Sequence, residues 1–250
     1  DKYIHHSVLN IFNSKLKSSL EFFANHIKFN SKNSIIRNTP ISYTGRIDLK
    51  PFYIDTEIKA KQFDLNYLLK KSFWLDEIIS SNFFRNENFN GKLNISSSKI
   101  IKNKIFDKIN FVLNFDEGNL NFNETILSGS KIGSIKVFNS NFIEKDGRIF
   151  LEANARLDIE QYDLFYKKFF ISKSNRKKFK NIEFSFNFDA LNGSFYINRI
   201  IFYDLNGKRF NSELIDEIVD ENADKSFSYF NMISFRNYLN KVLLLHSELG

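Results

Sequence analysis

The sequence predicts a mainly β protein: a long curled antiparallel sheet of the repeating β-groove type, a few short helices and a C-terminal amphipathic helix. Two observations carry this prediction. Apolar and polar residues alternate in segment after segment, and successive side chains of a strand point to opposite faces of a sheet. Turn-forming residues separate these segments at 116–118, 128–130, 145–147 and 204–207, where tight reversals would join neighbouring strands.

The composition is that of a folded protein without thiol chemistry. The 250 residues are 42% hydrophobic and 26% charged, which is ordinary for a globular chain. There is no cysteine, which excludes disulfides, thiolate zinc sites and cysteine nucleophiles. The net charge is +7 and Lys and Arg are spread along the chain, so a dedicated nucleic-acid surface is not indicated.

Residues 1–63 are predicted to form the N-terminal strands of the sheet. The clearest strand pair lies at 41–49 and 53–60. Pro51, between the two, has no backbone N–H to give to a ladder and therefore suits a strand end.

Residues 64–84 are predicted to form a helical insert. Asp64 suits an N-cap, and leucines follow it at helical spacing. The insert either plugs the core or lies at a membrane face, where Lys70, Lys71 and Trp74 would contact lipid headgroups.

Residues 85–210 are predicted to form the main sheet, interrupted by a helix at 159–171. Asp158 and Gln161 fit a capping-box-like start for this helix. A basic stretch follows, and its Arg176, Lys177 and Lys178 either contact headgroups or are simply solvated.

Residues 211–250 are predicted to form a C-terminal helical segment. An acidic stretch at 213–224 precedes an amphipathic helix at 229–245, whose apolar face contains Phe235, Leu239, Val242 and Leu243. This helix either covers part of the apolar sheet face or acts as a gate or a docking element for a protein partner or a membrane.

The sequence contains no recognisable catalytic or metal-binding motif. No Gly-x-Gly-x-x-Gly, P-loop, His-Glu-x-x-His or nucleophile-elbow pattern is present. Asp and Glu in the strands alternate onto the polar face, where solvated carboxylates are ordinary. We therefore predict that the protein is not an enzyme and that it uses no cofactor or metal.

The apolar face of the sheet indicates binding of an apolar ligand. A wide apolar face must stack on another sheet, close into a barrel or hold a ligand. The sheet here either folds on itself or leaves apolar surface available, and we expect the second, with a trough wide enough for acyl chains. The predicted lining residues are apolar positions of the central and late strands: Leu93, Ile95, Ile109, Phe111, Leu113, Phe115, Leu120, Phe122, Leu151, Leu157, Ile182, Phe184, Phe186, Phe188, Phe195 and Ile197.

Several segments resemble the AsmA-like proteins. The run GRIDLKPF at 45–52, leading to FDLNYLL at 63–69, is similar to one half of the family pattern. The run FNGKLNI at 89–95 and the run GNLNF at 118–122 resemble its recurring strand unit. The runs GSIKV at 133–137 and FRNYLNK at 235–241 fit as well, so the resemblance extends over most of the chain.

The resemblance implies a setting that periodicity does not supply. AsmA-like proteins are anchored in the bacterial inner membrane by an N-terminal helix and project into the periplasm. They are similar to bridge-like lipid transfer proteins and are associated with phospholipid passage to, and assembly of, the outer membrane. We therefore expect the periplasmic C-terminal part of such a protein in a Gram-negative bacterium, separated from its N-terminal membrane anchor. The resemblance thus implies phospholipid or another acyl lipid as the partner, and it implies no catalytic residues.

Two other functions remain open. A structural β-solenoid or adhesin-like surface protein would bury its apolar face completely. A basic sheet that binds single-stranded nucleic acid would stack bases on aromatic side chains. The second function needs aromatics on the basic face, whereas the Phe residues here alternate away from Lys.

Overall fold

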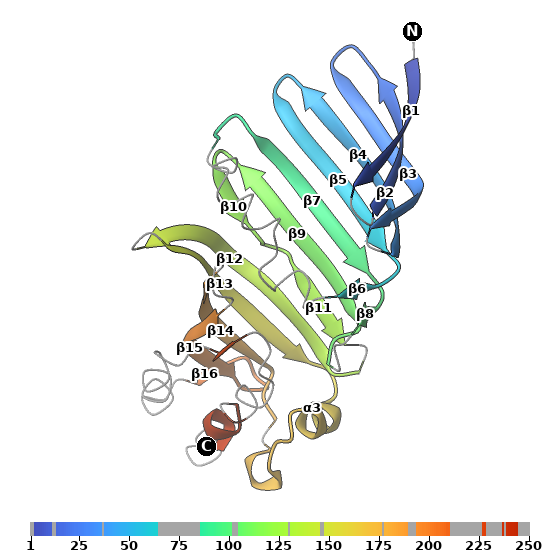
Figure 1. The fold of residues 1–250 in the computed structure, drawn as a ribbon. Coiled ribbons are helices and arrows are strands. Elements are labelled where there is room, and N and C mark those ends of the chain that lie inside the picture. Colours follow the sequence, from blue (N-terminus) through green and yellow to red (C-terminus); the bar gives the residue numbers. More distant parts are fainter. Residues whose placement is uncertain are drawn as a thin grey trace. The chain divides into compact units, whose positions relative to one another are not determined.

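The computed structural model shows a mainly β protein with few helices (Figure 1). The structure describes residues 3–11, 14–36, 38–64, 86–101, 105–129, 131–145, 148–176, 178–189, 194–210, 227–228, 237 and 239–244. Contacts divide these residues into two compact units. We call the described residues up to Leu127 the N-terminal unit and those from Ser128 onward the C-terminal unit.

The N-terminal unit is a twisted sheet whose strands follow one another across it, as Figure 1 shows. Its strand order is β1-β2-β3-β4-β5-β7-β9, and β10 pairs with β9. The strands are β1 (Tyr3–Ile11), β2 (Ser14–Phe22), β3 (His26–Ile36), β4 (Thr39–Leu49), β5 (Phe52–Ala60), β7 (Asn90–Ser97), β9 (Lys108–Asp116) and β10 (Asn119–Asn121). A separate parallel pair is formed by β6 (Phe63–Asp64) and β8 (Ile100–Ile101), and β11 (Ile126–Gly129) contains the division between the units.

The sheet is mixed, and the prediction of an antiparallel sheet was wrong for one pair of neighbouring strands. β5 and β7 pair in parallel, with Tyr53 opposite Asn90 and Ala60 opposite Ser97. Parallel neighbours require a crossover of a dozen or more residues. The chain between Ala60 and Asn90 is long enough to provide one, whereas every other neighbouring pair of long strands in this unit is antiparallel.

Two of the predicted turns can be checked in atomic detail. Glu117 and Gly118 join β9 to β10, and both have positive φ angles of 46° and 78°, as a two-residue hairpin turn requires. Residues 204–207 also reverse the chain, with Gly207 N donating to Asp204 O at 2.9 Å. The predicted turn at 128–130 is shifted toward the C-terminus: β11 continues to Gly129, and Ile132 N donates to Gly129 O at 3.1 Å to close the turn.

The long strands of the C-terminal unit pair in antiparallel order. They are β12 (Gly133–Lys145), β13 (Arg148–Ile159), β14 (Asn181–Asp189), β15 (Ser194–Tyr203) and the short β16 (Arg209–Phe210), in that sequence, and β17 (Phe227–Ser228) also pairs with β15. The helix α3 (Tyr162–Lys168) and the 3-10 turn η2 (Lys173–Asn175) lie between β13 and β14 in the chain. Residues 239–244 are helical.

The predicted start of the helix at 159–171 was wrong. Asp158 belongs to β13, where it pairs with Asn181 and forms an ion pair with Arg156 at 3.1 Å. The helix α3 begins at Tyr162, and Gln161 occupies the N-cap position without a side-chain hydrogen bond. Ladder pairing on both sides of β13 therefore extends the strand through the residues that resembled a cap.

Parts of the predicted helical segments lie outside the described residues. This holds for 65–84 of the predicted insert, including Lys70, Lys71 and Trp74, and for the acidic stretch at 213–224. Asp64, the predicted N-cap, is in β6. The described continuous part of the C-terminal helix is short, at 239–244, and its Leu239, Val242 and Leu243 are buried as an amphipathic helix requires.

Candidate functional site

Strand register gives the N-terminal unit one apolar face. Residues directly opposite each other in neighbouring strands point to the same side of a sheet. One cross-strand row joins Leu20 to Phe29, Gly45, Thr56, Leu93 and Leu113. The adjacent rows are at least as apolar, so a single face extends from β2 to β9.

We call this surface the apolar face and define it by the register. Its larger members are Leu16, Leu20, Phe22, Ile27, Phe29, Ile41, Tyr43, Ile47, Leu49, Phe52, Ile54, Ile58, Leu93, Ile95, Ile109, Phe111, Leu113 and Phe115.

Solvent exposure changes along the apolar face. In β9 the side chains of Ile109, Phe111 and Leu113 are buried. From β2 to β7 almost all the apolar-face side chains keep part of their surface exposed, and at the strand ends Phe22, Leu49 and Phe52 are 39%, 43% and 37% exposed. A solvent-reachable apolar surface therefore spans β2 to β5 and continues into β7.

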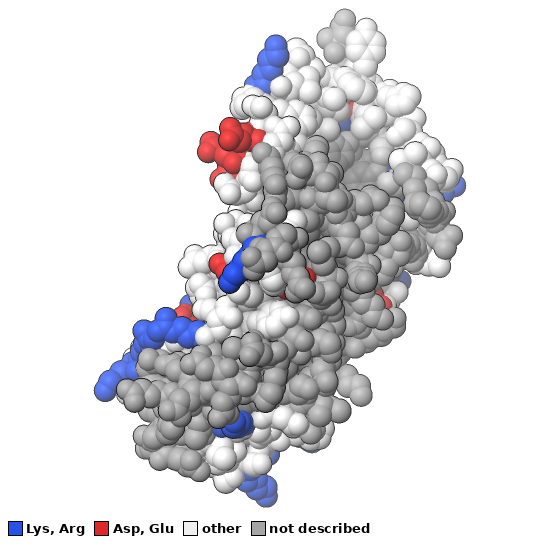
Figure 2. All heavy atoms as spheres, turned by 60° about the vertical axis from the view of Figure 1, so that its left-hand side comes forward, with Lys and Arg blue, Asp and Glu red and all other residues white. Residues whose placement is uncertain are grey.

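The opposite face of the same strands is polar. One row of it joins Glu21, Lys28, Arg46, Asp55 and Lys92. Ion pairs lie on this face, including Arg46–Asp48 at 2.6 Å and Lys59–Glu57 at 3.2 Å. In the view of Figure 2 the Lys and Arg side chains of the described residues lie at several separate places. Charges of both signs therefore keep this face in water.

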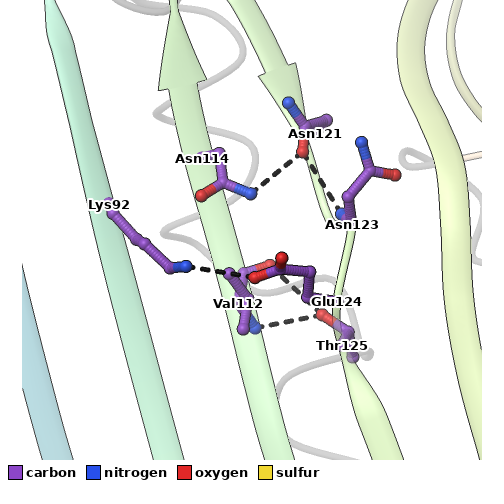
Figure 3. A network of polar contacts seen from close by, with 7 residues as sticks. All are labelled: Lys92, Val112, Asn114, Asn121, Asn123, Glu124 and Thr125. Atoms are coloured by element: carbon purple, nitrogen blue, oxygen red, sulfur yellow. Dashed lines mark hydrogen bonds and ion pairs between the residues drawn. The ribbon is translucent and has the colours of Figure 1, made fainter.

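A polar network holds the segment after β10 against β9 (Figure 3). Val112 N donates to Thr125 Oγ1 at 3.0 Å, and the Thr125 hydroxyl donates to Val112 O at 3.1 Å. Asn114 Nδ2 donates to Asn121 Oδ1 at 3.0 Å, and Lys92 reaches Glu124 at 3.1 Å. Side chains thus satisfy backbone groups of β9 where β10 has ended, so the network is structural.

A buried hydroxyl cluster interrupts the apolar face at irregularities in the β2–β3 and β3–β4 pairing. Ser34 Oγ accepts from Lys17 N at 2.9 Å and lies 2.7 Å from Ser31 Oγ. The Tyr43 hydroxyl donates to Lys17 O at 3.2 Å. Since Ser34 is only 1% exposed, these hydroxyls replace ladder hydrogen bonds that the irregularity removes.

Gly45 makes room for an aromatic ring on the apolar face. A Cβ atom at this position would run into the Phe29 ring, and it would lie 2.6 Å from Asp55 O. The Phe29 ring therefore lies across β4, 6.2 Å from the Tyr43 ring between centroids. A close approach of this kind is a physical reason for glycine inside a strand.

The corresponding apolar face of the C-terminal unit is covered. Leu157, Ile182 and Phe202 form one of its rows, and all three are buried. Phe179 contacts Phe202 with ring centroids 5.3 Å apart, and Phe165 of α3 lies 6.3 Å from Phe179. Aromatic side chains from α3 and the segment after it therefore cover this row of the face.

The C-terminal helix belongs to this cover. Asn240 Oδ1 accepts from Ser172 N at 3.2 Å, and Asn240 Nδ2 donates to Phe170 O at 3.3 Å. Asn175 Nδ2 donates to Asn240 O at 3.4 Å. The described part of the helix is thus fixed to the segment after α3 by side-chain hydrogen bonds.

The predicted lining residues fall on both units and are mostly buried. In the N-terminal unit Leu93, Ile95 and Phe115 are half-buried, and the other five positions are buried: Ile109, Phe111, Leu113, Leu120 and Phe122. In the C-terminal unit only Phe184 is half-buried, while the side chain of Phe195 lies outside the described residues. The buried members there are Leu151, Leu157, Ile182, Phe186, Phe188 and Ile197.

Several accessible positions of the apolar face were not among the predicted lining residues. They lie on β2 to β5, for example Leu20, Ile47, Ile54 and Ile58. Their alternation is visible in the sequence, but alternation alone does not say which strands remain uncovered.

Two of the predicted headgroup contacts are described. Arg176 is exposed, yet its Nε donates to Ile171 O at 3.0 Å and its guanidinium lies 5.7 Å from the Tyr166 ring. Lys178 is exposed and lies over the Tyr162 ring at 6.0 Å. Lys70, Lys71, Trp74 and Lys177 lie outside the described residues.

A cavity of about 170 Å³ lies on the C-terminal unit, lined by Phe138, Asn154, Glu183, Phe184, Ser185, Arg199 and Ile201. Glu183 accepts from the Tyr203 hydroxyl at 2.9 Å, and burial together with this carboxylate raises the pKa of Tyr203. The volume is below the roughly 300 Å³ of ordinary ligand pockets. No acid–base pair poised for catalysis is evident in this cavity.

The described residues offer neither a metal cluster nor a membrane-crossing helix. Within them, no group of three or more His, Asp or Glu is placed to hold a metal ion. None of the helices in this part of the chain is both long and apolar enough to cross a membrane.

Comparison of the chain with protein-family profiles, with curated proteins and with solved structures gave no match. The geometry of the described residues alone defines the candidate site, and the apolar face of the N-terminal unit is its most distinctive part.

Proposed function

We propose that the N-terminal unit binds the acyl chains of phospholipids on its apolar face and that the protein is a lipid-binding or lipid-transfer module. The observation that carries the proposal is the partial exposure of apolar side chains across β2 to β7, backed by a charged opposite face. Extended exposed apolar surface on a protein usually marks a binding site.

The energetics suit a mobile, weakly selective ligand. Full burial of one Leu, Ile or Phe side chain contributes about 1.5–3 kcal/mol. A side chain that is only half-buried in the protein gains the remaining part of this free energy when a ligand covers its exposed surface. Ile47, Ile54 and Ile58 lie on adjacent strands and are all half-buried. Because the attraction is hydrophobic and non-directional, we expect little discrimination between headgroups.

The length of the strands suits acyl chains. β4 has 11 residues and β5 has nine, and each extends by roughly 3.3 Å per residue. Acyl chains would lie against the apolar face, while polar headgroups remain in water at the strand ends.

The resemblance to AsmA-like proteins supports a cellular setting for this activity. In that setting the sheet is part of a curled groove of repeating β units in the periplasm of a Gram-negative bacterium. An inner-membrane anchor outside this sequence holds the protein, and the groove supports lipid transport to the outer membrane or its assembly. The C-terminal helix then offers a contact for a protein partner.

Neighbouring residues on opposite faces of β5 provide a matched test. Ile54 is on the apolar face and Tyr53 is on the polar face, and each is replaced by lysine. Native mass spectrometry of the detergent-free protein should detect co-purified phospholipid in the wild type. Ile54→Lys should lower the lipid-bound fraction about tenfold, because it removes an apolar contact with the acyl chain and places a charge against that chain.

Tyr53→Lys should keep the wild-type lipid signal, since Tyr53 points away from the ligand. Circular dichroism of both variants checks that they fold. A wild-type protein without bound lipid, or equal losses in both variants, would contradict the proposal. The first of these results, together with no signal from a dye that reports exposed apolar surface, would favour a purely structural β protein.

A further inference from the structure

A run of positive charge without any acid lies in the chain after Asp163, within and beyond the helix that follows β13. Residues 164–182 contain seven Lys and Arg and no Asp or Glu. Without these seven, the remaining 29 cations of the chain equal its 29 Asp and Glu. The net charge of +7 therefore corresponds to this one segment. We call residues 167–176 and 178–180 the basic loop.

An exposed aromatic residue lies in the basic loop in an unfavourable backbone conformation. Phe170 has a φ of 52° and its side chain is 71% exposed. Phe170 N donates to Lys167 O at 3.3 Å and Ile171 N donates to Tyr166 O at 2.9 Å, which is the hydrogen-bond pattern of a Schellman helix end. Glycine is the usual residue here, because a bulky side chain is sterically disfavoured at positive φ.

The basic loop is held firmly from within. Ile171 and Phe179 are 2% and 0% exposed and anchor the loop in the core of the C-terminal unit. The hydrogen bonds of Asn240 to Phe170 O and Ser172 N fix the residues on either side of Ile171. The exposure of Phe170 is thus imposed by the packing around it.

Cationic residues lie on both sides of Phe170 in the sequence. Lys167, Lys168, Lys173 and Lys178 are all exposed, and the first two are the last residues of α3, separated from Phe170 only by Phe169. An exposed aromatic residue among lysines is typical of segments that sit at a membrane interface, where the ring enters the headgroup region and the cations meet anionic lipids.

We propose that the basic loop docks the C-terminal unit onto a membrane surface that contains anionic phospholipid, with Phe170 inserted at the interface. A membrane fits better than a nucleic acid, because binding of single strands uses several aromatic platforms along a groove. The docking step rests on the proposed lipid binding and deepens it, because it names the membrane surface with which the protein would exchange lipid. It uses different residues, so either idea can fail without the other.

The sharpest test separates stability from binding. The 250-residue protein is sedimented with vesicles of phosphatidylglycerol and phosphatidylcholine, and with vesicles of phosphatidylcholine alone. The wild type should bind the anionic vesicles more tightly, and added salt should weaken that binding. Phe170→Gly should raise the melting temperature, since glycine suits the backbone, but weaken vesicle binding about tenfold through loss of the inserted ring. A purely structural role would lower the melting temperature instead.

Charge reversal tests the cations independently. Lys173→Glu with Lys178→Glu should weaken binding to anionic vesicles by about fivefold or more per residue. Lys15→Glu with Lys17→Glu makes the same charge change on the polar face of the N-terminal unit and should have a much smaller effect. The proposal is overturned if the wild type does not prefer anionic vesicles, if Phe170→Gly binds like the wild type, or if both double variants lose binding equally. Salt-sensitive binding of a single-stranded oligonucleotide, without vesicle binding, would overturn it in favour of nucleic acid.

Retention of a fluorescent fatty acid by the same variants distinguishes the two proposals. The basic-loop variants should bind this probe like the wild type, because the apolar face of the N-terminal unit is unchanged. Loss of vesicle docking with normal probe binding would support both proposals. Vesicle docking by a wild type that binds no probe would leave docking in place and contradict acyl binding at the apolar face.

Discussion

In the N-terminal unit the apolar face from β2 to β7 keeps its side chains partly exposed, whereas in the C-terminal unit most side chains of the corresponding face are buried, and residues of α3 and the segment after it cover the row that ends at Phe202. The strands of both units are built from the same alternation of apolar and polar residues. The difference lies in aromatic side chains supplied by other segments, above all Phe165 and Phe179. An alternating strand thus specifies that one face avoids water, but separate segments decide whether protein or ligand covers it.

The largest effect that would sharpen this comparison is expected when a buried side chain in the core of the C-terminal unit is shortened. Phe179 is fully buried between Phe165 and Phe202, so Phe179→Ala should lower the free energy of unfolding by about 3–5 kcal/mol. Phe29→Ala removes a half-buried ring from the apolar face of the N-terminal unit and should cost about 1–2 kcal/mol. Denaturant titration of the lipid-free proteins measures both values. Equal losses would mean that the two faces are equally sealed, which would remove the basis for ligand binding at the first.

A smaller effect is expected at the hydroxyl cluster of the N-terminal unit. Ser34→Ala removes the acceptor of Lys17 N and leaves buried polar groups without a partner, which should cost about 1–3 kcal/mol. Ser42→Ala, on the polar face of β4, is the control and should change the free energy of unfolding by less than about 0.5 kcal/mol. If the Ser34 variant were as stable as the control, the irregular pairing of β3 would not depend on these hydroxyls, and the apolar face could be made continuous at little cost.

How far the sequence predicts this molecule depends on whether the deciding interaction is local. The strand at Ile41 to Leu49 was predicted and confirmed, because alternation is a property of adjacent residues. The parallel pairing of β5 with β7 was not, since a strand carries no local mark of its neighbour's direction. Asp158 resembled a helix cap, but pairing of β13 with β14 kept it in the strand.

The candidate site was less predictable than the strands. Leu157 and Ile54 have the same alternating surroundings in the sequence, yet the first is buried and the second is partly exposed. Their difference arises from distant segments that fold over one set of strands and not the other. The sequence did not reveal Phe170 for another reason. A helix end of this kind is usually marked by a glycine, and here Phe170 itself occupies the position with positive φ.

The smallest predicted effect concerns alkaline pH and belongs to the sealed unit. Burial, and to a lesser extent the neighbouring Tyr162, raise the pKa of Tyr166 from 10.0 to about 12. A group whose pKa is higher in the folded state stabilises the fold fully below its unfolded pKa, and this contribution is lost as pH rises from about 10 through about 12. Tyr166→Phe carries no ionisable phenol, so its unfolding midpoint in an alkaline titration should lie at higher pH than that of the wild type. Near-ultraviolet absorbance follows phenolate formation, and circular dichroism follows unfolding. Identical midpoints would show that ionisation of this tyrosine does not limit the alkaline stability of the C-terminal unit, and that another process causes its unfolding at high pH.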